Sequence, residues 1–380
     1  MSGGLLEGVP GPASVRFDVD DERLARAAWS RLAEPGDLPA RQLVQEFGAS
    51  AALRGLLRGQ GPPRWRSRLS DLDPVRDVRA LERVGARFVV PSDPEWPGEP
   101  LSRLGVEQPF GLWVRGPLDL GEACERAIAV VGSRNCTAYG ERVALELAAD
   151  CARDGVTVVS GGAYGIDGAA HRGALQVAGR TVTVLACGVD RIYPTGHDQL
   201  FDRIRQVGAV VSEVPPGSSP TRWRFVERNR LIACLSRLAV VVEATDRSGA
   251  SSTAARAAKH GVPVGAVPGP VYSPTSYGPH QLLRTGAVCI TSAGDALDEI
   301  QRLGEAPSRP APPRRRAAHD DLPPADLRVF DALPVRTTAP VASLAKVAGL
   351  DESTVLAALG RLELRNLAVR SGAGWRRART

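Results

Sequence analysis

The stretch Ala127-Ile-Ala-Val-Val-Gly-Ser-Arg-Asn-Cys-Thr-Ala-Tyr-Gly140 decides the fold of this chain. Its first five residues, 127–131, form an apolar and partly β-branched run, which is typical of a buried strand. A loop that opens on Gly132 follows and leads into a helix-like stretch at 139–153. Strand, glycine loop and helix in this order indicate one unit of an α/β protein.

The same unit recurs as far as about Leu303. Further apolar runs predict strands at 156–160, 181–186, 209–213, 238–244, 262–267 and 287–291, with helices such as 251–260 between them. Repeated units imply an α/β fold with a doubly wound sheet and right-handed crossovers. Ligands of such sheets bind at the carboxyl ends of the strands, so we expect the functional site there.

Three loops follow predicted strands, and each opens a helix. They begin at Gly132, at Gly161 and at Ser248, the last after the strand 238–244. Glycine permits close backbone approach and a helix N-terminus carries the positive end of a dipole, so each loop can aim N–H groups at an anion. Turn geometry and helix capping explain any one loop alone. Three such loops at one sheet edge favour an anion site.

A second motif, Phe-Val-Glu-Arg-Asn-Arg at 225–230, stands at the head of an apolar helical run. Arg228 and Arg230 can pair with phosphates through their forked donors, and Asn229 can position a neighbour. Phe225 offers a ring on which an unpaired base can stack, so the combination suits single-stranded nucleic acid. The alternative is structural: two solvated arginines in the first turn of a surface helix, with Phe225 as its hydrophobic staple.

Composition favours a globular protein with an anionic partner. The chain has 380 residues, 43% of them hydrophobic, a mean hydropathy of −0.12 and a net charge of +6. Lys259 and Lys346 are the only lysines. Two explanations of the arginine excess, a GC-rich genome and phosphate binding, are therefore equally good. The chain start does not resemble a secretion signal, and no apolar run reaches the ~20 residues of a membrane span. We therefore expect a cytoplasmic protein without a membrane partner.

Metal, cofactor and catalytic sites are not indicated. The six cysteines lack C-x-x-C spacing, and several lie in apolar runs. The first loop reads G-S-R-N-x-T rather than G-x-G-x-x-G, and G-x-x-x-x-G-K-[ST] is absent from the sequence. Asp167 and His171 could form an acid–base pair, but an N-cap and its local hydrogen-bond partner fit them better.

Other segments flank the α/β region. Residues 1–75 show apolar residues at helical spacing between 21 and 59 and predict a small helical domain. The 76–303 domain begins with two bridging strands at 88–91 and 112–116. Residues 304–324 are rich in proline and arginine and predict a mobile linker.

Residues 325–380 predict helices at 325–333, 341–348 and 352–365 and then a hairpin, which is the winged-helix order. The last of these helices begins with Asp351 and Glu352, whose carboxylates oppose phosphates. Protein contact or regulation is therefore favoured over duplex reading.

Taken in order, the motifs resemble those of the DprA/Smf family. They are Val-Gly-Ser-Arg-x-x-Thr-x-Tyr-Gly within 130–140, Ser-Gly-Gly-Ala-x-Gly-Ile-Asp-x-x-Ala-His at 160–171, Gly-Val-Asp-x-x-Tyr-Pro at 188–194, Ser-Glu-Val-Pro at 212–215, Phe-x-x-Arg-Asn-Arg at 225–230, Val-Val-Glu-Ala-x-x-x-Ser-Gly at 241–249 and Val-Pro-Gly at 267–269. An ordered set of this kind is very specific.

The resemblance implies a non-enzymatic protein of natural transformation, without a cofactor, that binds and protects incoming single-stranded DNA and loads the RecA recombinase. It implies a homodimer formed through a Rossmann-like domain, a SAM-like N-terminal domain and a C-terminal winged helix. It also implies nucleic-acid contacts at Ser133, Arg134, Gly161, Gly162, Tyr164, Gly165, Arg222, Phe225, Arg228, Asn229, Arg230, Ser248 and Gly249.

Some positions depart from the family pattern. Val226 stands where the family often has proline, and Arg222 where it commonly has lysine. Residues 34–37 lack the Gly-x-Gly hairpin of a DNA-binding helix-hairpin-helix, so the N-terminal domain is not expected to touch DNA. Two other classes stay open: a nucleotide-phosphate-processing enzyme with an acid such as Glu243 at a strand end, and a winged-helix duplex-binding regulator.

Overall fold

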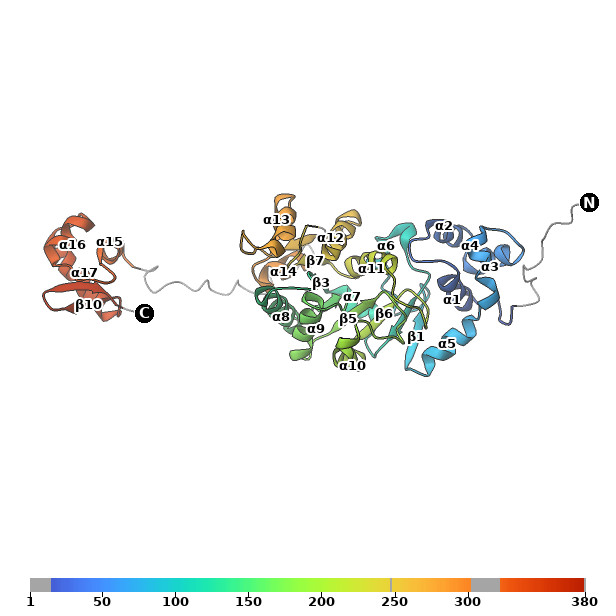
Figure 1. The fold of residues 1–380 in the computed structure, drawn as a ribbon. Helices are drawn as coiled ribbons and strands as arrows, with labels where there is room; N and C mark the ends of the chain where they lie inside the picture. The colour runs from blue at the N-terminus through green and yellow to red at the C-terminus, as the bar shows by residue number, and fades with distance from the viewer. Residues whose placement is uncertain (1–14, 247, 302–321, 379–380) are drawn as a thin grey trace, which may run out of the picture. The chain divides into compact units, whose positions relative to one another are not determined.

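The computed structural model describes residues 15–246, 248–301 and 322–378. These residues form two compact units, one before and one after residues 302–321 (Figure 1). The predicted linker falls largely outside the described residues, and a helix already begins at Pro324. In the ranges that the structure describes, no helix is long and apolar enough to cross a membrane.

A nine-stranded sheet organises the first unit in the order β1-β2-β6-β5-β4-β3-β7-β8-β9. The strands from β3 onward are parallel, and β1 and β2 form an antiparallel edge beside β6. The bounds are β1 Ala86–Val89, β2 Leu112–Arg115, β3 Ala127–Val131, β4 Thr157–Ser160, β5 Thr181–Leu185, β6 Ala209–Ser212, β7 Leu238–Val241, β8 Val264–Ala266 and β9 Val288–Cys289. The predicted α/β fold with a mostly parallel sheet is confirmed.

The strand order reverses at β3. From β3 the chain moves outward through β4, β5 and β6, then returns to β7 on the other side of β3 and moves outward again through β8 and β9. The loops that leave β3 and β7 therefore diverge in opposite directions. A crevice at the carboxyl ends of these two strands is the expected consequence.

Helices cover both faces of the sheet (Figure 1). Ile128 and Val130 of β3 pack with residues of α8 and α9 on one face, whereas Ala129 and Val131 pack with residues of α11 and α12 on the other. The helices of this region are α6 Gly98–Ser102, α7 Leu120–Glu125, α8 Ala138–Arg153, α9 Ile166–Gln176, α10 Asp198–Val207, α11 Arg222–Cys234, α12 Gly249–Lys259, α13 Tyr277–Arg284 and α14 Ala293–Ile300. Short 3₁₀ helices are η2 Leu69–Asp71, η3 Gly105–Glu107, η4 Thr195–His197 and η5 Pro274–Ser276.

The predicted N-terminal helices pack around Trp29, which is fully buried and donates a 3.0 Å hydrogen bond to the Ala49 carbonyl. These helices are α1 Glu22–Leu32, α2 Leu38–Phe47, α3 Ala49–Leu57, α4 Pro63–Arg66 and α5 Pro74–Glu82. They belong to the same compact unit as the sheet. The division at residue 75 and the SAM-like assignment stay predictions.

The second unit has three helices and a hairpin, α15 Pro324–Ala332, α16 Val341–Ala348, α17 Glu352–Leu364, β10 Ala368–Ser371 and β11 Gly374–Arg377. Gly349 ends α16 in the left-handed conformation, with φ of 63°. Asp351 caps α17 by accepting from the Thr354 N–H, so this carboxylate already has a structural partner. The winged-helix assignment of this unit stays a prediction.

Several predicted strands are longer than the observed ones. The run 238–244 contributes only 238–241 to β7, because the chain then turns away and Ala244 donates to the Thr275 carbonyl instead of to a strand. The runs 262–267 and 287–291 are likewise longer than β8 and β9, although Val267 still donates to the Val241 carbonyl and Ile290 to the Ala266 carbonyl. Apolar composition continues into buried loops at these ends, which residue patterns alone do not separate from strands.

Candidate functional site

A cleft of about 990 Å³ opens at the reversal point of the sheet. Its walls are the loop after β3, the N-terminal half of α11 and the first turn of α12. Of the residues that the sequence proposes for the site, this cleft brings together Ser133, Arg134, Arg222, Phe225, Arg228, Asn229, Ser248 and Gly249. Segments more than a hundred residues apart in sequence thus meet where the topology places a ligand site.

Phe225 and Tyr193 form an aromatic wall in this cleft, with ring centroids 5.5 Å apart and ring planes inclined by 51°. The Arg134 guanidinium lies 5.1 Å from the centroid of the Phe225 ring, within the range of a cation–π interaction. Phe225 is half-buried, and Tyr193 is 42% exposed. An unpaired base can therefore reach an aromatic ring while its phosphate meets a cation.

Arg228 lies on the floor of the cleft and is only 7% exposed. It donates through Nη1 to the carbonyls of Gly161, at 2.8 Å, and Val184, and through Nε to Asn229. Burial lowers its pKa to about 10, although the nearby Asp167 carboxylate raises it, so the side chain is cationic at neutral pH. Nη2 makes no hydrogen bond to the described residues and stays available to a ligand.

Two of the three loops use their backbone donors internally. Asp167 accepts from the N–H groups of Gly161 and Ala163, at 3.1 and 3.4 Å. At the start of α8, Glu243 accepts from the N–H and the hydroxyl of Thr137, and it also accepts from Thr275. The protein's own carboxylates thus occupy two places where the sequence suggests a ligand anion.

The first turn of α12 is the open helix N-terminus at this edge. Ser248 caps it by accepting from the Ser251 N–H, while the N–H groups of Gly249 and Ala250 make no hydrogen bond within the described ranges. Both residues line the cleft. Asn229 holds this turn against α11 by donating to the Gly249 carbonyl at 3.3 Å. Free donors and the helix dipole favour an anion here.

Other proposed residues lie outside the cleft lining: Gly161, Gly162, Tyr164, Gly165 and Arg230. Gly165 has φ of 74°, and a Cβ there would lie 2.2 Å from the Ser133 carbonyl oxygen, so only glycine fits this close loop approach. Tyr164 is exposed and packs edge-on against His197, with ring centroids 4.8 Å apart. These residues shape the loops around the cleft.

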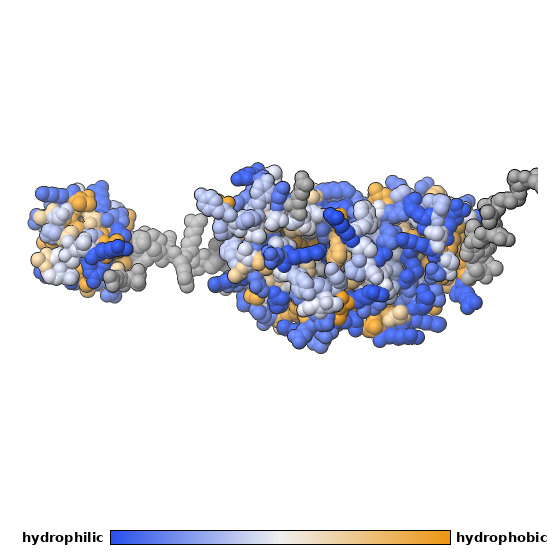
Figure 2. Space-filling view, viewed as in Figure 1, coloured by the Kyte–Doolittle hydropathy of each residue, from blue (hydrophilic) through white to orange (hydrophobic). Residues whose placement is uncertain are grey.

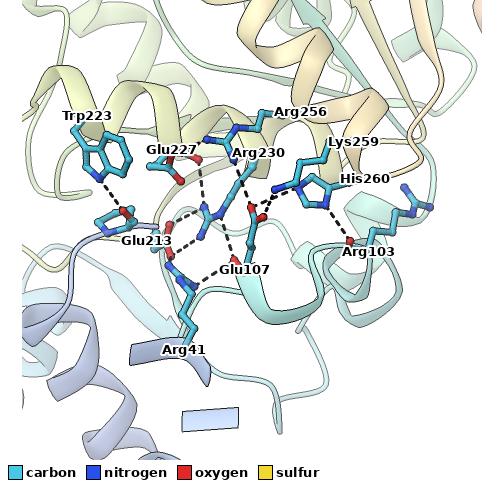
Figure 3. Close-up of polar contacts among 11 residues, drawn as sticks. Arg41, Arg103, Glu107, Glu213, Trp223, Glu227, Arg230, Arg256, Lys259 and His260 are labelled. Carbon is cyan, nitrogen blue, oxygen red and sulfur yellow. Dashed lines mark hydrogen bonds and ion pairs between the residues drawn. The ribbon is translucent and has the colours of Figure 1, made fainter. Parts of the chain in front are cut away.

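Arg230 is fully buried on the side of α11 away from the cleft, in the ionic cluster shown in Figure 3. It forms a bidentate pair with Glu213, with N–O distances of 2.7 and 2.8 Å, and Arg41 of α2 pairs with the same carboxylate. Glu227 accepts from Arg256 of α12 at 2.6 Å. The cluster joins α2, α11 and α12 to the residue that follows β6.

Glu213 carries the charge that holds this cluster together. Burial acts to raise its pKa, but Arg230 and Arg41 outweigh that effect and lower the pKa to about 2. Neither sequence interpretation of Arg228 and Arg230 foresees this arrangement, because neither arginine is solvated and the two serve different partners.

The predicted pairing of Asp167 with His171 needs correction. Asp167 is not the N-cap of α9, since Gly165 holds that position, and its carboxylate instead closes the loop before the helix. His171 Nδ1 lies 2.7 Å from the Thr181 hydroxyl, and burial lowers its pKa to about 3, so the ring is neutral. Both side chains have structural partners.

The structure adds cleft residues that the sequence does not single out: Asn135, Tyr193, Thr221, Thr245 and Ser252. Tyr193 is the most informative of these, because it completes the aromatic wall. It is the tyrosine of the Gly-Val-Asp-x-x-Tyr-Pro motif, which is a signal in the sequence. Its loop follows β5, two strands from β3, and its reach into the cleft could not be inferred from spacing.

Fold and cleft together define a class of protein: a mostly parallel α/β protein with aromatic and cationic side chains in the cleft where the strand order reverses. We call this cleft the switch-point cleft. The DNA recombination-mediator protein A family model matches residues 87–301. A Mycobacterium tuberculosis relative, described as a DNA processing protein DprA, is 44% identical over 376 residues, covering 94% of this chain and 95% of its own length. The chain belongs to the DNA recombination-mediator protein A family.

Other relatives agree with this assignment. DNA processing protein DprA of Bacillus subtilis is 39% identical over 194 residues, which cover 51% of this chain and 65% of that protein. The crystal structure of DprA from Streptococcus pneumoniae matches with a TM-score of 0.64 and 30% identity, covering 76% of this chain and all of that one. A Helicobacter pylori DprA structure, reported for its single-stranded DNA binding mode, matches with a TM-score of 0.50 and 28% identity over 56% of this chain and 94% of that chain.

Proposed function

We propose that this protein binds single-stranded DNA in the switch-point cleft, protects it and delivers it to the RecA recombinase. The observation that carries the binding proposal is the aromatic wall of Phe225 and Tyr193 beside the guanidinium of Arg134. Stacking on a ring tolerates every base, and a neighbouring cation meets the phosphate whatever the sequence. Family membership and the Helicobacter pylori relative support the same ligand.

Phosphates have three further partners in the proposed complex. They are the free Nη2 of Arg228, the exposed Arg222 at the start of α11 and the open N–H groups of Gly249 and Ala250. This set suits a strand that crosses the cleft better than it suits a single phosphate group. The hydrogen bonds of Glu243 favour a binding protein over an enzyme that uses this residue as a catalytic acid, because its carboxylate oxygens already accept three hydrogen bonds.

Delivery to RecA and a homodimer formed through the Rossmann-like domain are the finer parts of the proposal. They rest on the family's description as a recombination mediator and on the motif resemblance. Arg230, Tyr164 and the glycines of 161–165 act in this proposal by shaping the cleft rather than by touching the strand. A preformed complex with single-stranded DNA should accelerate RecA filament formation.

Arg134→Ala tests the binding proposal. We expect the salt slope of oligothymidylate binding to fall by about 0.7, which corresponds to about fivefold weaker binding at 0.1 M salt. The matched control is Arg142→Ala on the exposed face of α8, whose partner is Glu146 at 2.8 Å, and it should change little. Equal affinity and slope for Arg134→Ala and wild type would contradict the site. Turnover of nucleoside phosphates by the wild type would favour an enzyme instead.

A further inference from the structure

An arginine-lined groove of about 420 Å³ lies along α5, well away from the cleft. We call it the arginine groove and define it by Arg16, Arg76, Arg79 and Arg83. The three helical arginines stand at i, i+3 and i+7 and therefore share one face of α5. All four side chains are exposed.

These arginines differ from their neighbours in having no counter-charge. Within the described ranges, none of the four guanidinium groups makes a hydrogen bond or an ion pair, whereas the nearby Arg31 pairs with Asp77 at 2.6 Å. Of the described lining residues, Asp73 alone has a carboxylate, and it accepts from the Arg76 backbone N–H as the cap of α5. Like charges this close repel one another, so an anionic ligand would relieve an unfavourable arrangement.

The groove runs along the free edge of the sheet, since α5 lies beside the edge strand β1 (Figure 1). Near the start of α5, Arg31 links Asp77 to the Pro216 carbonyl, just beyond the carboxyl end of β6. The other end of α5 leads into β1. There Ala86 pairs with Arg115 at the side of the sheet opposite to the carboxyl ends of the parallel strands. The row of arginines thus begins at the sheet edge on which the cleft opens and runs away from it.

The lining selects one class of ligand. Among the described residues, its only apolar members are Val75 and Ala80, and none of the lining residues carries an aromatic ring. The central part of a peptide interface is typically rich in apolar or aromatic anchors, and an amphipathic membrane contact has an apolar face. On the face of the molecule that Figure 2 draws, hydrophilic residues predominate. Unpaired arginines without anchors fit a phosphate backbone contacted by charge alone.

We propose that the arginine groove binds the sugar–phosphate backbone of the same DNA strand that occupies the cleft, several nucleotides further along. This inference rests on the proposed function. Five strand spacings separate β3 from β1 in the sheet, which at about 4.8 Å each is roughly 24 Å. At the ~3.4 Å step of stacked nucleotides, this span takes roughly seven residues of DNA. A very short strand can fill the cleft without reaching the groove.

Strand length therefore separates the two sites. The test compares tetrathymidylate with thirty-residue oligothymidylate on the triple variant Arg76→Gln/Arg79→Gln/Arg83→Gln. We expect unchanged affinity for the short strand. For the long strand, each lost phosphate contact should lower the salt slope by about 0.7 and weaken binding about fivefold at 0.1 M salt.

A second triple variant controls for net charge. Arg142→Gln/Arg153→Gln/Arg180→Gln removes three exposed arginines that have carboxylate partners, and it should leave both strands nearly unaffected. Melting temperatures check that each variant is folded.

Three outcomes would contradict the proposal that the arginine groove binds DNA. The first is unchanged long-strand affinity and slope in the groove variant, and the second is an equal loss for both strand lengths. The third is that the wild type binds anionic vesicles and the groove variant does not, while the variant keeps its long-strand affinity. The groove would then be a membrane-binding surface. If the wild type fails to bind tetrathymidylate but the groove variant still loses long-strand affinity, the cleft proposal fails. The groove then still contacts DNA, but not as a continuation of the cleft.

Discussion

Phe225 carries the sharpest functional claim at the scale of single residues. The guanidinium carbons of Arg134 and Arg228 lie 5.1 and 5.8 Å from the centroid of its half-buried ring, and the Tyr193 ring lies 5.5 Å away. Two cations thus help to fix the ring, and part of it remains exposed in the cleft. A stacking residue needs this combination of fixed position and accessible surface.

Phe225→Ala should weaken oligothymidylate binding by roughly 1–3 kcal/mol, because one base loses its stacking partner. Phe225→Trp should retain most of the affinity. The control is Phe47→Ala on α2, which removes an exposed aromatic ring outside the cleft and should not change binding. Titration and thermal melting of all three variants give the measurement. A lower melting temperature for Phe225→Ala with normal affinity would show that the ring is structural.

At the scale of elements, α11 has two working faces. Arg228 faces the cleft and Arg230 faces the buried ionic cluster. Two residues along a helix are separated by roughly 200° of rotation, so both side chains cannot serve one pocket. Helical geometry alone therefore contradicts a shared phosphate role for the pair. The actual environment of Arg230 could not be predicted, because no local pattern connects it to Glu213 or Arg41.

Glu213→Gln tests the cluster that holds α11 in place. At neutral pH the variant leaves buried arginines without their counter-charge, and we expect a loss of about 3–5 kcal/mol in the free energy of unfolding. The folded-state pKa of about 2 lies below the ordinary value of 4.5, so the stabilisation is complete above pH 4.5 and falls as the pH drops toward 2. Urea unfolding of both proteins from pH 7 to pH 3 measures this difference.

The stability gap between wild type and Glu213→Gln should therefore narrow in acid. Glu146→Gln is the control, because Glu146 sits in an exposed pair with Arg142 and its loss should cost about 0–1 kcal/mol. A gap for Glu213→Gln that stays constant from pH 7 to pH 3 would mean that the carboxylate is not held ionised by its arginines.

At the scale of the whole molecule, the sequence predicts the architecture well. The alternation of apolar runs and helices gives the mostly parallel sheet. The residues that converge on the cleft come from loops at carboxyl strand ends and from the N-terminal parts of α11 and α12, as such a sheet requires. The helices at 341–348 and near 352–364 also match the second unit closely. Helical periodicity and capping involve residues that are close together in the chain, so a single sequence is enough to recognise them.

Long-range partners are what the sequence could not supply. The glycine loops look open to a ligand anion, yet Asp167 and Glu243 already accept donors there. Glu243 lies 106 positions from Thr137, and only the paired strands β3 and β7 bring them together. Tyr193 enters the cleft in the same way, from a loop after β5.

The most direct test of the central claim is photocrosslinking of the intact chain to oligothymidylate that carries 4-thiothymidine, followed by peptide mapping. The cleft proposal predicts crosslinks to the peptides that contain Phe225 and Tyr193, with competition by unlabelled single strands and much weaker competition by duplex. Crosslinks confined to residues 322–378, or to positions of the first unit outside the cleft and the arginine groove, would contradict it.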